Sequence, residues 1–114
     1  MVLNVNDLIE DIKNTASGIL SKDVSTVRGF SERQLHGIAT QAALVASGIA
    51  SGQIDDSTRD FFLDQLVELA KNFVNTLVGL MLATIERLWN AIVSVLWNAI
   101  SRATNIQLQA FRPL

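Results

Sequence analysis

Hydrophobic and polar residues in the first half of the chain alternate in two helical patterns. Within residues 5–20, apolar side chains recur every three or four positions, opposite a face that carries Glu10 and Asp11. Asn4 precedes this pattern and has the side chain of a good N-cap, with Asp7 at the third helical position. We therefore expect a first amphipathic helix over residues 5–20, followed by a polar loop.

A second helix is predicted over residues 32–51 by the clearest local signal in the chain. Ser31 and Gln34 have the spacing of a capping box, and Gly52 stands where a left-handed residue commonly ends a helix. The face expected to be buried is formed mostly by small residues. These small residues should let another helix approach closely; they include Ala39, Ala42, Ala43, Ala46 and Gly48.

A third, much longer helical pattern runs from residue 56 to residue 104 without a proline. As one helix it would be about 70 Å long, whereas the second helix would reach about 30 Å. Its apolar face also changes direction by roughly 100° between the two halves of the segment. Between the halves, residues 77–83 are apolar on every side. Two shorter helices cannot cover such a segment.

Two all-α architectures explain this pattern. In the one that we favour, a very long helix over residues 56–104 packs its first half on the first two helices and its second half on another copy of the protein. In the alternative, the chain breaks near residues 75–79 and folds back as a four-helix up-and-down bundle. Both give a single domain over residues 1–105. Residues 106–114 then form a tail whose apolar residues include Ile106, Leu108 and Phe111.

The second half of the long segment is the predicted interface. Its apolar side chains exceed what the first two helices can bury, and tryptophan is a common interface anchor. Glu86 lies at the border of the apolar stripe, where we expect it to be paired within the interface rather than to act as a catalytic acid. The expected partner is a second copy in a homo-oligomer, with a dimer preferred, or another protein. The predicted interface residues are Leu77, Leu80, Met81, Ile85, Glu86, Leu88, Trp89, Ile92, Val93, Leu96, Trp97 and Ile100.

Composition narrows the function classes. The net charge is −2 and no three basic residues are consecutive, so nucleic-acid binding is not expected. The absence of cysteine excludes disulfides and thiolate chemistry, and the acidic N-terminal region does not resemble a signal peptide. Both features fit a cytoplasmic protein. In the long segment the uncharged runs, residues 72–85 and 88–101, have 14 residues each and are shorter than the approximately 20 residues of a transmembrane helix.

Candidate chemistry is sparse. His36 lies four residues after Glu32, a spacing compatible with two metal ligands, but we interpret it as a surface histidine because no further ligand accompanies the pair. Asp60, Asp64 and Glu68 form a row on one helix face, which we interpret as a solvated acidic face. No catalytic or phosphate-binding motif occurs, and no cofactor is expected.

The leading functional hypothesis is therefore a non-enzymatic helical protein that self-associates. A membrane-active amphipathic helix is a second hypothesis, disfavoured by the scarcity of Lys and Arg on the polar face of the last segment. A third is a bundle that binds a small apolar ligand between helices. The residues expected to line that site are Leu80, Met81, Trp89 and Trp97.

Overall fold

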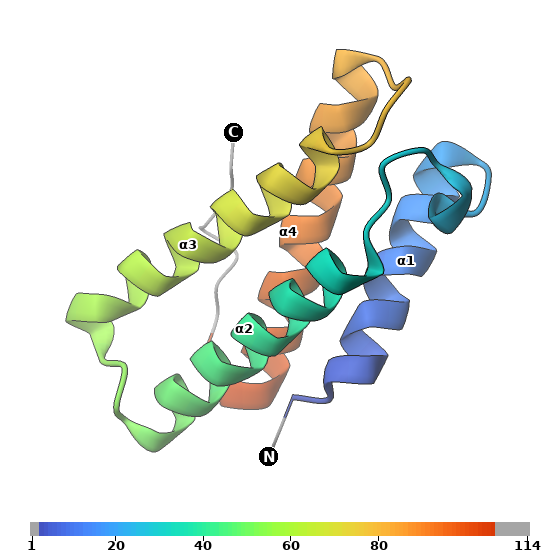
Figure 1. Ribbon diagram of the computed structural model, residues 1–114. Coiled ribbons are helices and arrows are strands. Elements are labelled where there is room, and N and C mark those ends of the chain that lie inside the picture. The colour runs from blue at the N-terminus through green and yellow to red at the C-terminus, as the bar shows by residue number, and fades with distance from the viewer. Residues whose placement is uncertain (1–2, 107–114) are drawn as a thin grey trace.

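A computed structural model describes residues 3–106, which contain four α-helices, one 3-10 turn and no strand (Figure 1). The elements are α1 (Val5–Leu20), the 3-10 turn η1 (Val24–Thr26), α2 (Glu32–Ser51), α3 (Asp56–Asn75) and α4 (Leu82–Thr104). Residues 1–2 and 107–114 lie outside the described part of the chain, and with them Leu108 and Phe111 of the predicted tail. The prediction of an all-α helical bundle is confirmed.

The helices run alternately up and down, so that each connection turns the chain back on itself (Figure 1). Each helix packs on its sequence neighbours, α1 packs on α4, and α2 also packs on α4. The α2 face that meets the core includes Ala39, Ala42 and Ala46, all buried. Their small side chains allow helices to approach closely, as the sequence predicted.

The long helix that we favoured over residues 56–104 is wrong, and the alternative with a break is confirmed. Residues 76–81 are not helical, and the chain reverses there. After α3 ends, the backbone N–H of Leu77 donates to the carbonyl of Val74, and that of Val78 donates to the carbonyl of Arg28. Gly79 follows with a φ of +85°, a conformation that glycine adopts without strain. The reversal lets α4 bury most of its stripe on the first three helices of the same chain, so a second copy is not needed to cover residues 88–100.

Polar side chains begin three of the four helices. Asn4 and Ser31 accept hydrogen bonds from the backbone N–H of Asp7 and Gln34, at 3.0 and 3.1 Å, as the sequence predicted. Asp55 caps α3 by accepting from the N–H groups of Ser57 and Thr58. At the other end of α2, Gly52 has the predicted left-handed conformation, with φ +83°. Capping therefore fixes the start of these helices locally, before any tertiary contact is considered.

Candidate interaction surface

The structure divides the predicted interface residues into three groups. The largest group packs in the chain's own core, because the reversal at residues 76–81 returns α4 to the bundle. In this fold their side chains are therefore not available to a second protein. They are Leu77, Leu88, Ile92, Val93, Leu96, Trp97 and Ile100, all at most 4% exposed. Leu80, Ile85 and Trp89 are half-buried, and Met81 and Glu86 are exposed.

Trp89 acts as an anchor between two helices of one chain. Its indole Nε1–H donates a 3.0 Å hydrogen bond to the carbonyl oxygen of Val67 in the middle of α3. The ammonium group of Lys71 lies over the ring, 5.3 Å from its centroid, at a distance suited to a cation–π interaction. Trp89, one of the predicted interface residues, thus ties α4 to α3 within the chain.

Met81, an exposed residue of the predicted interface, lies at one end of the bundle beside two exposed apolar residues that were not predicted. We call this end the apolar tip and define it as Val78, Met81 and Leu82. These side chains are 51, 75 and 71% exposed. Leu82, Ile85 and Leu88 continue the core stripe of α4 at three-residue spacing, but their exposure falls from 71% through an intermediate value to 0%. The stripe therefore extends past the point where the other helices can cover it. Figure 1 shows the first turn of α4 projecting beyond the bundle.

The polar surroundings of the tip are mostly positive. Met81 occupies the N-cap position of α4 and makes no side-chain cap hydrogen bond, so the positive end of this helix is open. The carbonyl of Arg28 accepts a 2.8 Å hydrogen bond from the N–H of Val78, which fixes this exposed arginine beside the tip. Arg87 and Glu86 are exposed on the following turn of α4.

A second exposed apolar area lies between α2 and α3, in a groove of about 500 Å³. We call it the α2–α3 groove; it is lined by Gln41, Phe61, Asp64, Gln65, Glu68 and Leu69. Phe61 is 62% exposed, and Leu44, three residues after Gln41 on α2, is 61% exposed. Two residues of the acidic row, Asp64 and Glu68, thus lie beside exposed apolar surface rather than on a purely solvated face.

Comparison with protein-family models, curated proteins and solved structures found no match. The function of the chain must therefore be inferred from its own surface.

Glu32 and His36, which were considered as a pair of metal ligands, each contact a nearby side chain. Glu32 accepts a 3.1 Å hydrogen bond from the ammonium group of Lys13 on α1, which raises the pKa of Lys13. His36 is exposed, and its Nδ1 lies 3.4 Å from the hydroxyl of Thr40. Across residues 3–106, no three His, Cys, Asp or Glu side chains are grouped so that they could hold a metal ion. Glu32 and His36 thus each contact a different neighbouring side chain, Lys13 and Thr40 respectively.

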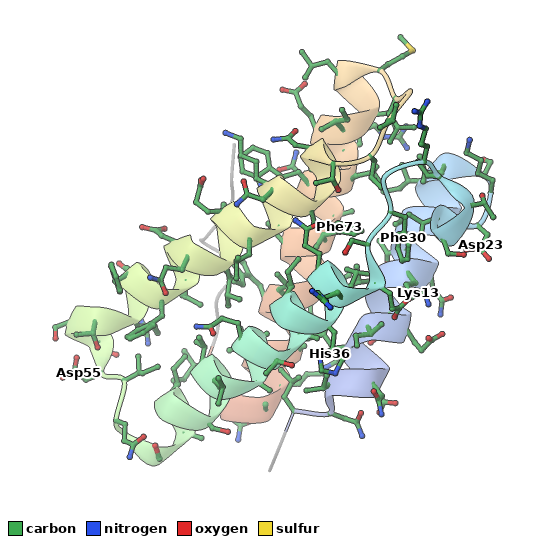
Figure 2. The ribbon with its side chains drawn as sticks, viewed as in Figure 1. Lys13, Asp23, Phe30, His36, Asp55 and Phe73 are labelled. Atoms are coloured by element: carbon green, nitrogen blue, oxygen red, sulfur yellow. The ribbon has the colours of Figure 1, made fainter. Side chains whose placement is uncertain are left out.

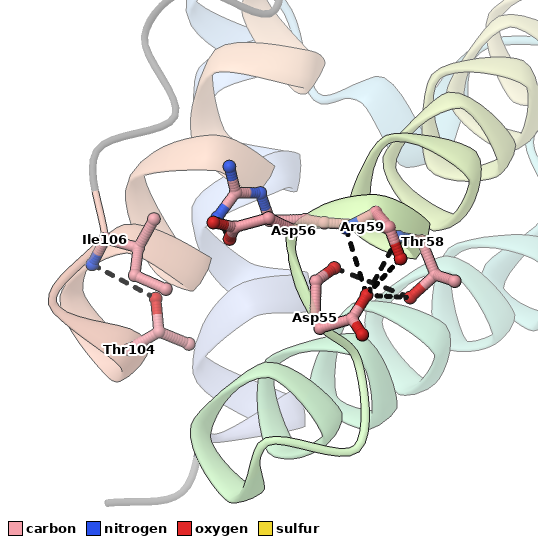
Figure 3. A network of polar contacts seen from close by, with 7 residues as sticks. Asp55, Asp56, Thr58, Arg59, Thr104 and Ile106 are labelled. Atoms are coloured by element: carbon pink, nitrogen blue, oxygen red, sulfur yellow. Dashed lines mark hydrogen bonds and ion pairs between the residues drawn. The ribbon is translucent and has the colours of Figure 1, made fainter.

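Asp55 centres a compact polar network at the start of α3 (Figure 3). Its Oδ1 accepts from the hydroxyl and the N–H of Ser57, at 2.6 and 3.0 Å, and these bonds lower the pKa of Asp55. Asp56 forms an ion pair with Arg59 at 3.0 Å. Asp23 is held similarly by Ser25 at the opposite end of the bundle, and its pKa is also lowered (Figure 2). Asp23 and Asp55 are therefore N-cap residues, and Asp56 forms an ion pair within the first turn of α3.

Sequence reasoning missed Val78, Leu82, Leu44, Phe61 and Leu69 as exposed apolar residues. A signal existed for Leu44 and Phe61. Both fall opposite the apolar stripe of their helix, so a helical projection leaves them facing solvent, whereas Leu69 lies at the edge of its stripe. Leu82 carries no such signal, because it lies on the stripe and is exposed only because the bundle ends there. No helix within the described range is long and apolar enough to cross a membrane.

Proposed function

We propose that this chain is a non-enzymatic helical module that self-associates through the apolar tip. The observation that supports the proposal is the uncovered continuation of the α4 stripe, with Met81 and Leu82 more than two-thirds exposed. Neighbouring apolar side chains at one end of a bundle are typical of a binding surface rather than of a solvated one. The proposal keeps Leu80, Met81, Ile85 and Glu86 from the predicted interface and adds Val78 and Leu82.

Sedimentation velocity over about 1–300 µM protein tests the proposal, since this range covers the weak affinities of small interfaces. We expect the mean mass of the wild-type chain to rise with concentration, and Met81→Asp to suppress that rise. Ser94→Asp is the matched control, because Ser94 is an exposed residue of the same helix outside the tip. A wild-type chain that stays monomeric throughout contradicts self-association.

A lipid surface is a second candidate, favoured by the arginines beside exposed apolar residues at the tip. Flotation with vesicles containing anionic lipid distinguishes the two. Co-flotation that Met81→Asp abolishes, without any self-association in solution, would favour the membrane. An apolar ligand between Met81 and Trp97 fits less well, because these residues are about 24 Å apart along α4 and Trp97 is buried.

A further inference from the structure

We infer that the self-association is head-to-tail, with the apolar tip of one copy docking in the α2–α3 groove of the next. This inference rests on the proposed function and specifies its geometry. It pairs the two main exposed apolar areas of the described surface, the tip with Met81 and Leu82 and the groove with Phe61 and Leu69. A single contact would then cover the exposed apolar surface of both the tip and the groove.

Charge favours this pairing. The groove is lined by the carboxylates of Asp64 and Glu68. The tip carries Arg28 beside Val78, Arg87 and Glu86 on the next turn, and the open, positive end of α4, so its positive groups outnumber its one carboxylate. Docking the tip in the groove brings opposite charges together. Tip-to-tip pairing would instead bring the arginines of two copies near one another and leave the groove exposed.

The contact must be between two copies. Leu69 lies six residues before the end of α3 and Phe61 lies fourteen before it, which places the groove about 9–21 Å down the helix from the reversal. The tip is fixed at the reversal by the bond between Val78 and Arg28. One copy therefore cannot place its own tip in its own groove. Because the two surfaces differ, the contact is heterologous: an open assembly keeps a free tip at one end and a free groove at the other, and only closure into a ring covers both.

A mixing experiment tests the geometry with two full-length variants, Met81→Asp in the tip and Phe61→Asp in the groove. Both residues are exposed, so circular dichroism should show wild-type helix content for each. Phe61→Asp should melt like the wild type, whereas Met81→Asp places a good capping residue at the N-cap of α4 and should melt at the same temperature or higher. Alone, each variant should have its association weakened at least about tenfold, since every pairing in the sample lacks one apolar partner. Mixed one to one, they should form a heterodimer and stop there, because only one intact tip and one intact groove can meet.

The outcomes separate the two ideas. If Phe61→Asp alone associates like the wild type while Met81→Asp does not, the contact is tip-to-tip; the head-to-tail geometry is overturned and the proposed function stands. If the wild-type chain never associates, both are overturned. If the mixture forms no heterodimer although both variants are folded, head-to-tail docking is overturned.

Salt gives an independent measurement. Raising the ionic strength from about 0.05 to about 0.5 M should weaken wild-type association, because the facing charges are exposed and therefore screened. Glu68→Gln should weaken association at low salt and reduce its salt dependence. Association that strengthens with salt and ignores Glu68→Gln would mean that apolar contact alone drives it, which contradicts docking at the acidic groove.

Discussion

The backbone N–H of Val78 donates a 2.8 Å hydrogen bond to the carbonyl of Arg28, joining the α3–α4 reversal to the segment that leads into α2. Next to this bond, the backbone of Gly29 is so close to Thr76 that a Cβ at residue 29 would meet the Thr76 carbonyl oxygen at 1.9 Å. Gly29 also has a φ of +92°. A glycine in one connection thus fixes where another connection crosses it.

Gly29→Ala should destabilise the fold strongly, by about 3 kcal/mol or more, because the methyl group adds a backbone clash to the strain of a positive φ. Gly79→Ala is the matched control. Its φ of +85° is similar but nothing lies within 4 Å of its Cβ position, so it should cost only about 1 kcal/mol. Chemical denaturation of both variants measures the difference. Equal losses would show that the contact with Thr76 does not constrain the reversal.

Trp89→Phe should lower the free energy of unfolding by about 1 kcal/mol, because it removes the hydrogen bond to the Val67 carbonyl while keeping an aromatic ring. Lys71→Met, which removes only the cation over the ring, should cost no more than about 0.5 kcal/mol. Urea denaturation followed by circular dichroism compares the two. If Lys71→Met lowered the free energy of unfolding more than Trp89→Phe, the cation–π interaction would contribute more stability than the hydrogen bond, contrary to this prediction.

Phe73→Ala should cost about 3–5 kcal/mol, because Phe73 is fully buried and meets Phe30 edge-on with ring centroids 5.9 Å apart (Figure 2). Phe61→Ala on the same helix removes the same atoms from an exposed site and should change stability by no more than about 0.5 kcal/mol. Thermal melts at a concentration too low for association separate core from surface. A large loss for Phe61→Ala would show that this residue belongs to the core and not to a docking surface.

Asp55 should make the stability of the bundle depend on acidity. Its pKa is lowered by the hydrogen bonds from Ser57, so its contribution is present above the pKa of an unfolded aspartate, near pH 4, and is lost as the pH falls through the lower folded value. Asp55→Asn retains a good N-cap but cannot titrate. The stability difference between wild type and this variant should therefore be largest at neutral pH and shrink below about pH 4. A constant difference from pH 7 to pH 2 would contradict this role.

Ending the chain after Gly79 should abolish cooperative folding. The truncation removes α4, whose Leu88, Ile92 and Leu96 are fully buried. Each such side chain contributes about 2 kcal/mol, and their sum approaches the whole stability of a small domain. Circular dichroism and thermal melting measure the result. A truncated chain that stays helical and melts cooperatively would mean that the first three helices form a core of their own.

The helix starts could be predicted because they are local. Asn4 and Ser31 bond to N–H groups three residues away, so residue identity and spacing are enough to place them. The rotation of the apolar face between residues 61 and 103 was also visible in the sequence, and the break between α3 and α4 explains it, since each half is a separate helix. The preferred architecture was wrong because residues 76–81 contain only one glycine and no other strong turn residue. The reversal depends instead on a tertiary bond, from Val78 to Arg28, that no local pattern records.

The same cause limited the prediction of the surface. Apolar residues of α4 have the same periodicity whether another helix covers them or not, so Leu82 and Leu88 cannot be told apart by sequence although one is 71% exposed and the other is buried. The groove depends on the lateral pairing of α2 with α3, which places Gln41 beside Phe61. Only the assembled bundle distinguishes stripe residues that are covered from those that extend past its end.

At the end of the bundle away from the tip, Leu3 and Asn4 line the same small pocket as Ala99 and Ala103. The start of the first helix and the end of the last are therefore neighbours, and the fold is almost a closed loop of chain. A short linker between residues 105 and 3 would close it, and opening the chain between Gly79 and Leu80 would cut no helix. Such a circular permutant would keep the same core while carrying its two free ends at the tip.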